Sequence, residues 1–383
     1  MSTNGTHEDH VVSTVIVGGG QAGLATAQAL LSRGQDCVVL ERNDRLGDNW
    51  RHHYDSLRLY TPARYDGLPG LPFPGEPWAY PSKDDVADYL QSYAAHLGLP
   101  VRLGVRVLRL ARETTEGGST EGGFVVETDA GTYHCDNVVV ATGTFGRRPH
   151  LPDFAADLRP AILQLHSSEY RRPSQLSPGP VLVVGASHSG CDIALELAAT
   201  RPTTLVGRDC GQLGLRWDSP QLRAALPVLV FAWRHVLTRR TPMGRRVMPH
   251  VRHHGGPMLR VKREDLAARG VVRNVSRVEG VRDGLPLLSD GTVVEAANIV
   301  WATGFEQHFD WIDLPVVGED GWPREYRGVV DDVPGLFFCG LSFQYAFSSM
   351  VLPGVGRDAG YVADRIAART REHPKSTRPL VEA

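Results

Sequence analysis

Two glycine-rich turns carry the residue types that bind a nucleotide pyrophosphate. The first, Gly18-Gly19-Gly20-Gln21-Ala22-Gly23, follows a β-branched run at residues 11–17. In such a turn the first glycine permits a tight bend, the second lets the backbone approach the phosphates, and the third lets a helix pack on the strand. Glu41 ends a second strand eighteen residues after Gly23, where a carboxylate accepts hydrogen bonds from ribose hydroxyls. This spacing predicts a dinucleotide site; the alternative is a glycine-rich loop without a ligand.

A second turn of the same design is Gly185-Ala186-Ser187-His188-Ser189-Gly190, which follows an apolar strand at residues 181–184. Arg208 stands eighteen residues after Gly190, at the interval that Glu41 keeps in the first unit. A guanidinium pairs with a 2′-phosphate that a carboxylate repels, so this turn predicts NADPH. Ser187 replaces the middle glycine, where its side chain either crowds the pyrophosphate or donates a hydrogen bond to it. The alternative is a structural βαβ unit with a solvated arginine.

Strands and helices must hold these turns in place. Residues 137–143 and 298–304 both read as a short apolar strand that ends in Ala-Thr-Gly, a small-residue turn suited to close backbone approach. Near the C-terminus, residues 335–340 predict a buried strand and residues 358–368 a helix. The glycines at 354–356 would open that helix, either facing a flavin or forming a packing turn.

The composition is that of an ordinary globular protein of two or three domains. The 383 residues are 42% hydrophobic and 22% charged, and a net charge of −2 gives no global argument for a nucleic-acid partner. The longest uncharged apolar stretch, residues 224–233, is shorter than the roughly 20 residues that a membrane span needs. Five cysteines without a CxxC spacing disfavour a dithiol reductase and predict a cytoplasmic protein.

A basic segment at residues 219–263 holds ten lysines or arginines and no acidic residue. Its candidate roles are a lid that guides NADPH or an acidic substrate, a helix on a membrane surface, a solvated hairpin packed on the NADPH domain, or a contact between copies of the chain. Its histidines 250, 253 and 254 lack a cysteine or carboxylate ligand nearby, so we expect no metal.

With paired glycine turns, paired Ala-Thr-Gly strands and no CxxC, the chain resembles the class B flavin-containing monooxygenases over nearly its whole length. Gly47-Asp48-Asn49-Trp50 looks like the family's glycine-tryptophan stretch beside the flavin ring. The segments 54–62, 80–83 and 89–93 are similar to the plant auxin-forming branch and its bacterial relatives.

The family's linker signature, FxGxxxHxxxY, is matched in part. His166 and Tyr170 keep its second half, while Pro160 and Ile162 stand where phenylalanine and glycine are expected. A tyrosine here favours the heteroatom-oxidising or auxin-type branch over the typical Baeyer-Villiger branch. We expect both matching side chains to brace the linker rather than to take part in the chemistry.

The resemblance implies that NADPH reduces FAD, that the flavin captures dioxygen as a C4a-(hydro)peroxide, and that a small organic molecule is oxygenated. It implies an α/β fold of two Rossmann-like domains, with residues 1–172 and 305–383 binding FAD and the inserted residues 173–304 binding NADPH. No catalytic side chain is assigned. The expected cofactor contacts are Gly18, Gly20, Gln21, Ala22, Gly23, Glu41, Arg42, Asn49, Trp50, Val107, Thr142, Gly143, Gly185, Ser187, His188, Ser189, Gly190, Arg208, Thr303 and Gly304.

Two rival functions remain open. A Baeyer-Villiger or oxidative-decarboxylating monooxygenase would consume a ketone or keto acid. A flavin-bound redox sensor would bind its cofactors without turnover, and stoichiometric consumption of NADPH and oxygen would exclude it. The expected partners are dioxygen and a small-molecule substrate, with no nucleic acid and no transmembrane segment; weak contact with a membrane surface and a homo-oligomer stay open.

Overall fold

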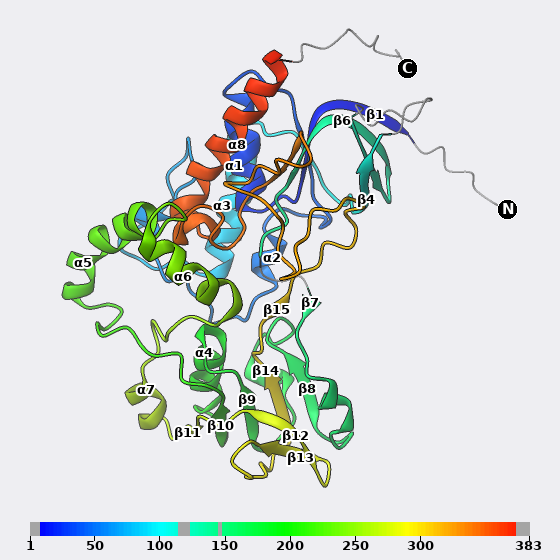
Figure 1. Ribbon diagram of the computed structural model, residues 1–383. Helices are drawn as coiled ribbons and strands as arrows, with labels where there is room; N and C mark the ends of the chain where they lie inside the picture. The colour runs from blue at the N-terminus through cyan, green and yellow to red at the C-terminus, as the bar shows by residue number, and fades with distance from the viewer. Residues whose placement is uncertain (1–7, 114–122, 145–147, 373–383) are drawn as a thin grey trace, which may run out of the picture.

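The computed structural model describes residues 8–113, 123–144 and 148–372, whose strands form two main sheets, one in the upper and one in the lower half of Figure 1. Helices cover both sheets, so the fold is α/β, as predicted. None of the helices in this described part combines the length and the apolar character that a membrane span requires.

The first sheet has seven strands in the described chain: six follow the order β3-β2-β1-β6-β5-β4, and β16 pairs with β6. Its central strands run parallel, and their β-branched residues are buried, as expected for strands covered on both faces. The antiparallel β4 and β5 form one edge. The bounds are β1 (Asp9–Val17), β2 (Val38–Leu40), β3 (Val101–Arg102), β4 (Val107–Arg112), β5 (Phe124–Thr128), β6 (Gly131–Val140) and β16 (Leu336–Phe338).

Three helices pack beside this sheet: α1 (Gln21–Leu31), α3 (Lys83–His96) and α8 (Leu352–Glu372). They share one apolar core with the sheet. The start of α3 is fixed by Ser82, whose hydroxyl accepts from the Asp85 backbone N–H while the Asp85 carboxylate accepts from Ser82 N. The helix α8 starts six residues before the predicted Asp358, because Gly354 lies inside its first turn; a Cβ there would come 2.1 Å from the Ser348 carbonyl.

The second sheet is parallel throughout its described strands, in the order β11-β10-β9-β14-β8. Its strands are β8 (Leu163–His166), β9 (Val181–Val184), β10 (Thr203–Val206), β11 (Val272–Asn274) and β14 (Asn298–Trp301), with α4 (His188–Leu197) and α7 (Arg263–Ala268) beside them. The strand β8 belongs to this sheet although it precedes residue 173, where the second domain is predicted to begin; that boundary stays a prediction.

Shorter elements lie in the connections between these strands and helices. They are α2 (Asp48–Arg51), β7 (Arg148–Pro149), β12 (Val278–Arg282), β13 (Leu285–Leu288), β15 (Phe305–Glu306) and the 3₁₀ turns η1 (Ala63–Tyr65), η2 (Asp153–Asp157), η3 (Pro173–Gln175) and η5 (Phe347–Met350). The β12–β13 hairpin turns at Asp283 and Gly284, which both have positive φ, as a tight hairpin turn requires.

The basic segment forms a helical hairpin of α5 (Pro220–Phe231), the π-helical turn η4 (Ala232–Val236) and α6 (Pro242–His253). The hairpin shape matches one of the predicted roles; its helices pack on the C-terminal part of the chain, whereas the end of the segment, at Gly256, contacts the start of α4 in the predicted NADPH domain. Arg239 and Arg252 both pair with the buried Glu325, at 2.6 and 3.4 Å, and Trp233 packs on Phe347. These contacts place the hairpin on the C-terminal part of the chain, beside the start of α8 (Figure 1).

Candidate functional site

The first glycine turn is packed so tightly that two of its glycines admit no side chain. Gly18 has a φ of +110°, and a Cβ there would lie 2.8 Å from the Ala141 carbonyl oxygen. A Cβ on Gly23 would lie 1.9 Å from the Gly18 carbonyl oxygen. The turn at the end of β1, the helix α1 and the Ala-Thr-Gly turn after β6 are thus in direct backbone contact, as the predicted roles of these glycines require.

Gly20, by contrast, faces open space. A Cβ on Gly20 would meet no atom within 4 Å, although it is the N-cap of α1. The adjacent Gln21 side chain donates to the Met350 carbonyl at 3.1 Å and leaves its own buried oxygen without a partner in the described chain. Ala22 contacts the strand end at Gly340. An open helix N-terminus at this point is suited to a phosphate group.

The Glu41 carboxylate is held at the edge of this open space. One oxygen accepts from the Gly19 backbone N–H at 2.7 Å, and the other accepts from the backbone and side chain of Asn43 at 2.9 and 2.6 Å. These donors fix the carboxylate and leave acceptor lone pairs for ribose hydroxyls. Arg42, the next residue, is exposed. The Val105 N–H donates to the Glu41 backbone carbonyl, which places Val107, the first residue of β4, near this site.

The Ala-Thr-Gly turn at residues 141–143 completes the first site. The Thr142 hydroxyl is buried and has no hydrogen-bond partner among the described residues, while Gly143 has a φ of +77° and open space at its Cβ position. An unpartnered buried hydroxyl, an open helix N-terminus and a fixed carboxylate lie around one turn. This donor and acceptor set fits the adenine-dinucleotide end of FAD.

The tryptophan stretch lies on α2. Gly47 caps this helix with a φ of +82°, and a Cβ there would come 2.6 Å from the Ala87 carbonyl of α3. Trp50 is half-buried against the α1–α3–α8 core and contacts the His53 ring, whereas Asn49 is exposed. Burial and the neighbouring cations Arg171 and Lys83 lower the pKa of His53 to about 4, so its ring is neutral at pH 7.

The second glycine turn repeats the geometry of the first. Gly185 has a φ of +109°, and its Cβ would lie 2.2 Å from the Ala302 carbonyl oxygen; a Cβ on Gly190 would lie 1.7 Å from the Gly185 carbonyl oxygen. The strand β14 therefore ends against this turn just as β6 ends against the first. In the turn that follows it, Thr303 donates to the His150 carbonyl and Gly304 accepts from the His166 ring at 3.0 Å.

The start of α4 is covered by a segment that the sequence did not predict there. The Ser187 hydroxyl donates to the Gly256 carbonyl at 3.0 Å, so in this structure its partner is the backbone at the end of the basic segment. His188 lies under the same segment, and burial lowers its pKa. Its buried Nε2 has no hydrogen-bond partner in the described chain. Ser189, the next residue in the first turn of helix α4, contacts the Tyr54 hydroxyl.

Arg208 is exposed two residues after the end of β10, the last strand of the second unit. It follows Gly207, whose φ of +128° places the backbone beside Gly185. Its guanidinium has no hydrogen bond or ion pair with any described residue. The neighbouring Asp209 is instead paired with Arg263 at 2.6 Å. Arg208 is therefore a cation just beyond β10 with no partner in the part of the chain that the structure describes.

A buried carboxylate, Asp192, links α4 to the segment that carries Tyr54 and Tyr60, and was missed by sequence reasoning. Its Oδ2 accepts from the hydroxyls of Tyr54 and Tyr60, each at 3.1 Å, and pairs with Arg260 at 2.9 Å. The tyrosines precede the second sheet in sequence, while Asp192 lies on α4. Burial raises the pKa of both tyrosines, which keeps their hydroxyls protonated as donors. An acid on the buried face of a predicted helix was the available signal.

The linker residues His166 and Tyr170 make structural contacts. Beside its bond to Gly304, His166 pairs with the Ser168 hydroxyl at 2.8 Å, and burial lowers its pKa. The fully buried Tyr170 donates to Glu196 of α4 at 2.7 Å. Both contacts agree with the bracing role that the sequence favoured.

A second buried acid, Asp66, lies in the loop after η1. Its side chain accepts from the Thr61 hydroxyl at 2.5 Å, and its other oxygen has no partner in the described chain. Burial raises the pKa of Asp66 from 3.8 to about 8, so the carboxyl is protonated at pH 7.

We predict that Asp66→Asn stabilises the protein increasingly as the pH rises. The unfolded chain releases this proton near pH 3.8 and the folded chain only near pH 8, so wild-type stability falls across that window. The asparagine amide stays neutral at every pH, so the variant does not lose stability across this window. At pH 8 the gain should be roughly 2–4 kcal/mol, and it should shrink toward zero near pH 4. Thermal unfolding at several pH values measures it, with the exposed Asp331→Asn as control; equal gains at pH 5 and pH 8 would contradict the assignment.

The chain is similar in sequence to known flavin-dependent enzymes. Residues 15–213, from β1 through the second glycine turn, match the family model described as pyridine nucleotide-disulphide oxidoreductase. The chain is 31% identical to indole-3-pyruvate monooxygenase YUCCA1 of Oryza sativa subsp. japonica, over 98% of this chain and 96% of that protein. It belongs to the class B flavin monooxygenases.

Two further relatives agree with this membership. The flavin monooxygenase is 34% identical to an uncharacterized CzcO-like oxidoreductase of Geobacillus kaustophilus, over 93% of this chain and 99% of the relative. It superposes on a flavin-containing monooxygenase structure from Stenotrophomonas maltophilia with a TM-score of 0.74 and 25% identity, covering 94% and 99% of the two chains. The predicted family, the two-unit Rossmann fold and the FAD- and NADP-dependent oxidoreductase class are confirmed.

Proposed function

We propose that this flavin monooxygenase uses NADPH to oxygenate a small organic molecule, and that the two glycine turns divide the cofactors between them. The observation that carries the proposal is their shared geometry with opposite terminal charge. Both turns are closed by a glycine against an alanine carbonyl, but one is followed by the fixed Glu41 carboxylate and the other by Arg208, which has no partner among the described residues. A carboxylate suits the bare ribose of FAD and a guanidinium the 2′-phosphate of NADPH.

The first site would hold FAD through the first turn, Glu41 and the Thr142–Gly143 turn, with Arg42, Asn49, Trp50 and Val107 at its margins. The second would hold NADPH through residues 185–190, Arg208 and the Thr303–Gly304 turn. Its pyrophosphate would then lie against Gly256 as well as α4, because the Ser187 hydroxyl already contacts that segment. We keep residues 1–172 with 305–383, and residues 173–304, as the proposed FAD and NADPH domains.

When bound, FAD would supply the oxygen chemistry. The residues of this chain would bind the two cofactors, orient them and enclose the flavin site. The Asp192 cluster fixes the second turn relative to Tyr54 and Tyr60 of the first unit, so that hydride donor and acceptor keep one alignment. The buried Trp50 face and the α1–α3–α8 core keep water from one side of the proposed flavin site.

Oxidative decarboxylation of a keto acid is the second candidate. The rice relative is named an indole-3-pyruvate monooxygenase, and it matches nearly the whole chain. The two candidates differ in the atom that is oxygenated, a soft nitrogen or sulfur in one and a carbonyl carbon in the other.

The five cysteines form no disulfide in the structure, which supports the proposed cytoplasmic location.

Product analysis tests the proposal. The purified protein should be yellow, and with NADPH and a thioether, an amine or a keto acid it should consume NADPH and oxygen in equal amounts. Mass spectrometry should find one oxygen from ¹⁸O₂ in the product of the accepted class. Complete conversion of the consumed oxygen into hydrogen peroxide, with no oxygenated product from any class, would favour a flavin oxidase. Binding of both cofactors without consumption would favour the redox sensor.

A further inference from the structure

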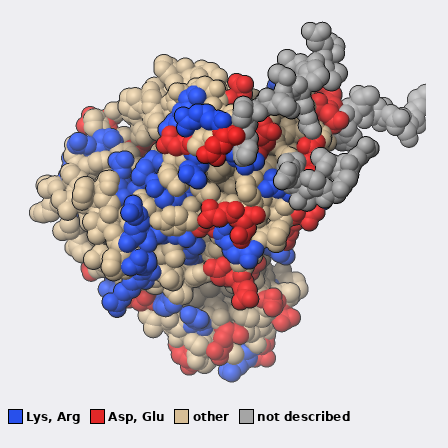
Figure 2. All heavy atoms as spheres, turned by 45° about the horizontal axis from the view of Figure 1, so that its top comes forward, with Lys and Arg blue, Asp and Glu red and all other residues tan. Residues whose placement is uncertain are grey.

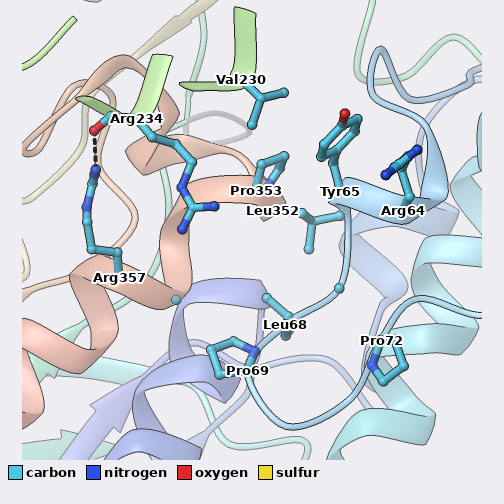
Figure 3. A pocket seen from close by; sticks show the side chains of 12 residues that line it. Arg64, Tyr65, Leu68, Pro69, Pro72, Val230, Arg234, Leu352, Pro353 and Arg357 are labelled. Atoms are coloured by element: carbon cyan, nitrogen blue, oxygen red, sulfur yellow. Dashed lines mark hydrogen bonds between the residues drawn. The ribbon is translucent and has the colours of Figure 1, made fainter. Parts of the chain in front are cut away.

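A cavity of about 360 Å³ lies where the basic hairpin meets the start of α8. Its walls come from three separate parts of the chain: the loop at residues 64–72, the end of α5 with η4, and the first turns of α8 (Figure 3). Half of the residues that line it are apolar, namely Leu68, Pro69, Pro72, Val230, Leu352 and Pro353, and the rest are arginines, a tyrosine and glycines. The volume lies within the range of small-molecule pockets.

The charged residues that line this cavity are all arginines: Arg64, Arg234 and Arg357. The Nε of Arg234 and the Nη2 of Arg357 are buried and have no hydrogen-bond partner in the described chain. Figure 3 shows the Arg234 side chain extending into the cavity beside Pro353 and near Arg357. Buried donors of this kind are almost always satisfied in folded proteins, so two of them at one cavity point to an acceptor that the chain does not supply.

The structure fixes one of these guanidinium groups, that of Arg357, before any ligand arrives. Arg357 donates through Nη1 to the Arg234 carbonyl at 2.6 Å and through Nε to Asp358 at 3.0 Å, and it stacks on the Tyr345 ring. Its Nη2 is the one nitrogen of this guanidinium without a partner among the described residues. Arg234 is presented by the π-helical turn Ala232–Val236, a rare geometry that occurs often at functional sites.

The electrostatic surroundings of the cavity favour an anion. Asp358 offsets one of the three arginine charges, and the segment 219–263, which contributes Arg234, carries nine further cations and no acid. Figure 2 shows a band of Lys and Arg on the side where α5 and α6 lie in Figure 1. The long helix α8 directs its N-terminal end, the positive end of its dipole, toward the cavity.

We propose that this cavity binds the carboxylate end of an amphiphilic organic acid, with Arg234 and Arg357 as its donors and the apolar wall around its hydrocarbon body. The inference rests on the proposed function, since it makes this acid the class of substrate that the monooxygenase takes. The cavity lies beside the proposed flavin site: Met350, whose carbonyl accepts from Gln21 at the start of α1, is two residues before Leu352. The basic hairpin thereby acts as a wall that selects an acidic substrate.

Calorimetric titration of the FAD-loaded protein with 3-phenylpropionate and 3-phenylpropionamide tests the proposal without turnover. The acid should bind at least about tenfold more tightly than the amide, because only the acid offers a charged acceptor to the arginines. Arg234→Gln should weaken the acid about tenfold or more and leave the amide unchanged. The matched control is Arg245→Gln, which removes the same charge from the exposed face of α6 in the same hairpin.

Arg357→Lys is the second variant, for the case in which Arg234→Gln does not fold. It keeps the charge beside Asp358 and removes the free guanidinium donor, and it should weaken the acid severalfold. Equal affinity for acid and amide would overturn the site. So would equal losses in Arg234→Gln and Arg245→Gln, or no binding by benzoate, 3-phenylpropionate or octanoate. If the enzyme oxygenates a neutral thioether with NADPH but binds no acid, the acid site is refuted and the proposed function is not. If it binds the acid but yields no oxygenated product from any substrate, the proposed function is refuted and the acid-binding site is not.

Discussion

Gly23→Ala is expected to leave the purified protein without FAD. The new methyl group would lie 1.9 Å from the Gly18 carbonyl oxygen, so α1 would have to move away from β1 and distort the turn. Alanine is favoured over glycine inside a helix by only about 1 kcal/mol, whereas forced overpacking against rigid backbone costs about 1–3 kcal/mol or more. The clash should therefore win, lowering thermal stability as well as flavin content.

Gly20→Ala separates the flavin from the fold in the same turn. Its methyl group would meet no protein atom within 4 Å, and its φ of −79° is compatible with alanine, so the apoprotein should unfold at the wild-type temperature. FAD affinity should nevertheless fall, because the methyl group would occupy the space proposed for the pyrophosphate. Gly214→Ala, which also meets nothing within 4 Å, is the matched control and should keep its flavin. Full FAD occupancy in Gly23→Ala, measured by the flavin absorbance per chain, would show that the first site is misplaced.

The two glycine turns could be predicted because their determinants are local. A β-branched strand, glycines at fixed offsets and a helix are all contained in about thirty residues. The structure adds that each turn is closed by an alanine carbonyl far away in sequence, Ala141 for Gly18 and Ala302 for Gly185. The repeated Ala-Thr-Gly endings indicated the need for close approach, although not which strand would serve which turn.

Contacts between distant segments were beyond the sequence. The hairpin's attachment depends on Glu325, about seventy residues beyond Arg252, and no periodicity connects a basic helix to one buried acid. Likewise, the contact of Gly256 with Ser187 and that of Asp192 with Tyr54 join segments about 70 and 140 residues apart, which no local pattern predicts. The early start of α8 shows the same limit in one element. Glycine at 354 suggested an opening turn, but this residue lies inside the helix, where a Cβ would come 2.1 Å from the Ser348 carbonyl oxygen.

Arg208→Ala is expected to abolish most of the enzyme's preference for NADPH over NADH. Arg208 is exposed and has no partner among the described residues, so its loss should not change the unfolding temperature. A charge-assisted bidentate contact with the 2′-phosphate contributes about 2–3 kcal/mol, which corresponds to roughly a thirtyfold to hundredfold rise in KM for NADPH and almost no change for NADH. Arg208→Lys should retain part of the preference, because lysine keeps the charge but not the planar fork.

The control for that measurement is Arg277→Ala, which removes an exposed arginine from the same part of the chain and should leave both KM values unchanged. Steady-state reduction of the flavin by each nucleotide, followed at the flavin absorbance, gives the two KM values. Asp209 is paired with Arg263, so repulsion of the 2′-phosphate by that carboxylate is already reduced in every variant. Because the expected loss is confined to the nucleotide that carries the 2′-phosphate, a parallel rise in KM for NADH and NADPH would mean that Arg208 supports the fold of β10 and does not read the phosphate.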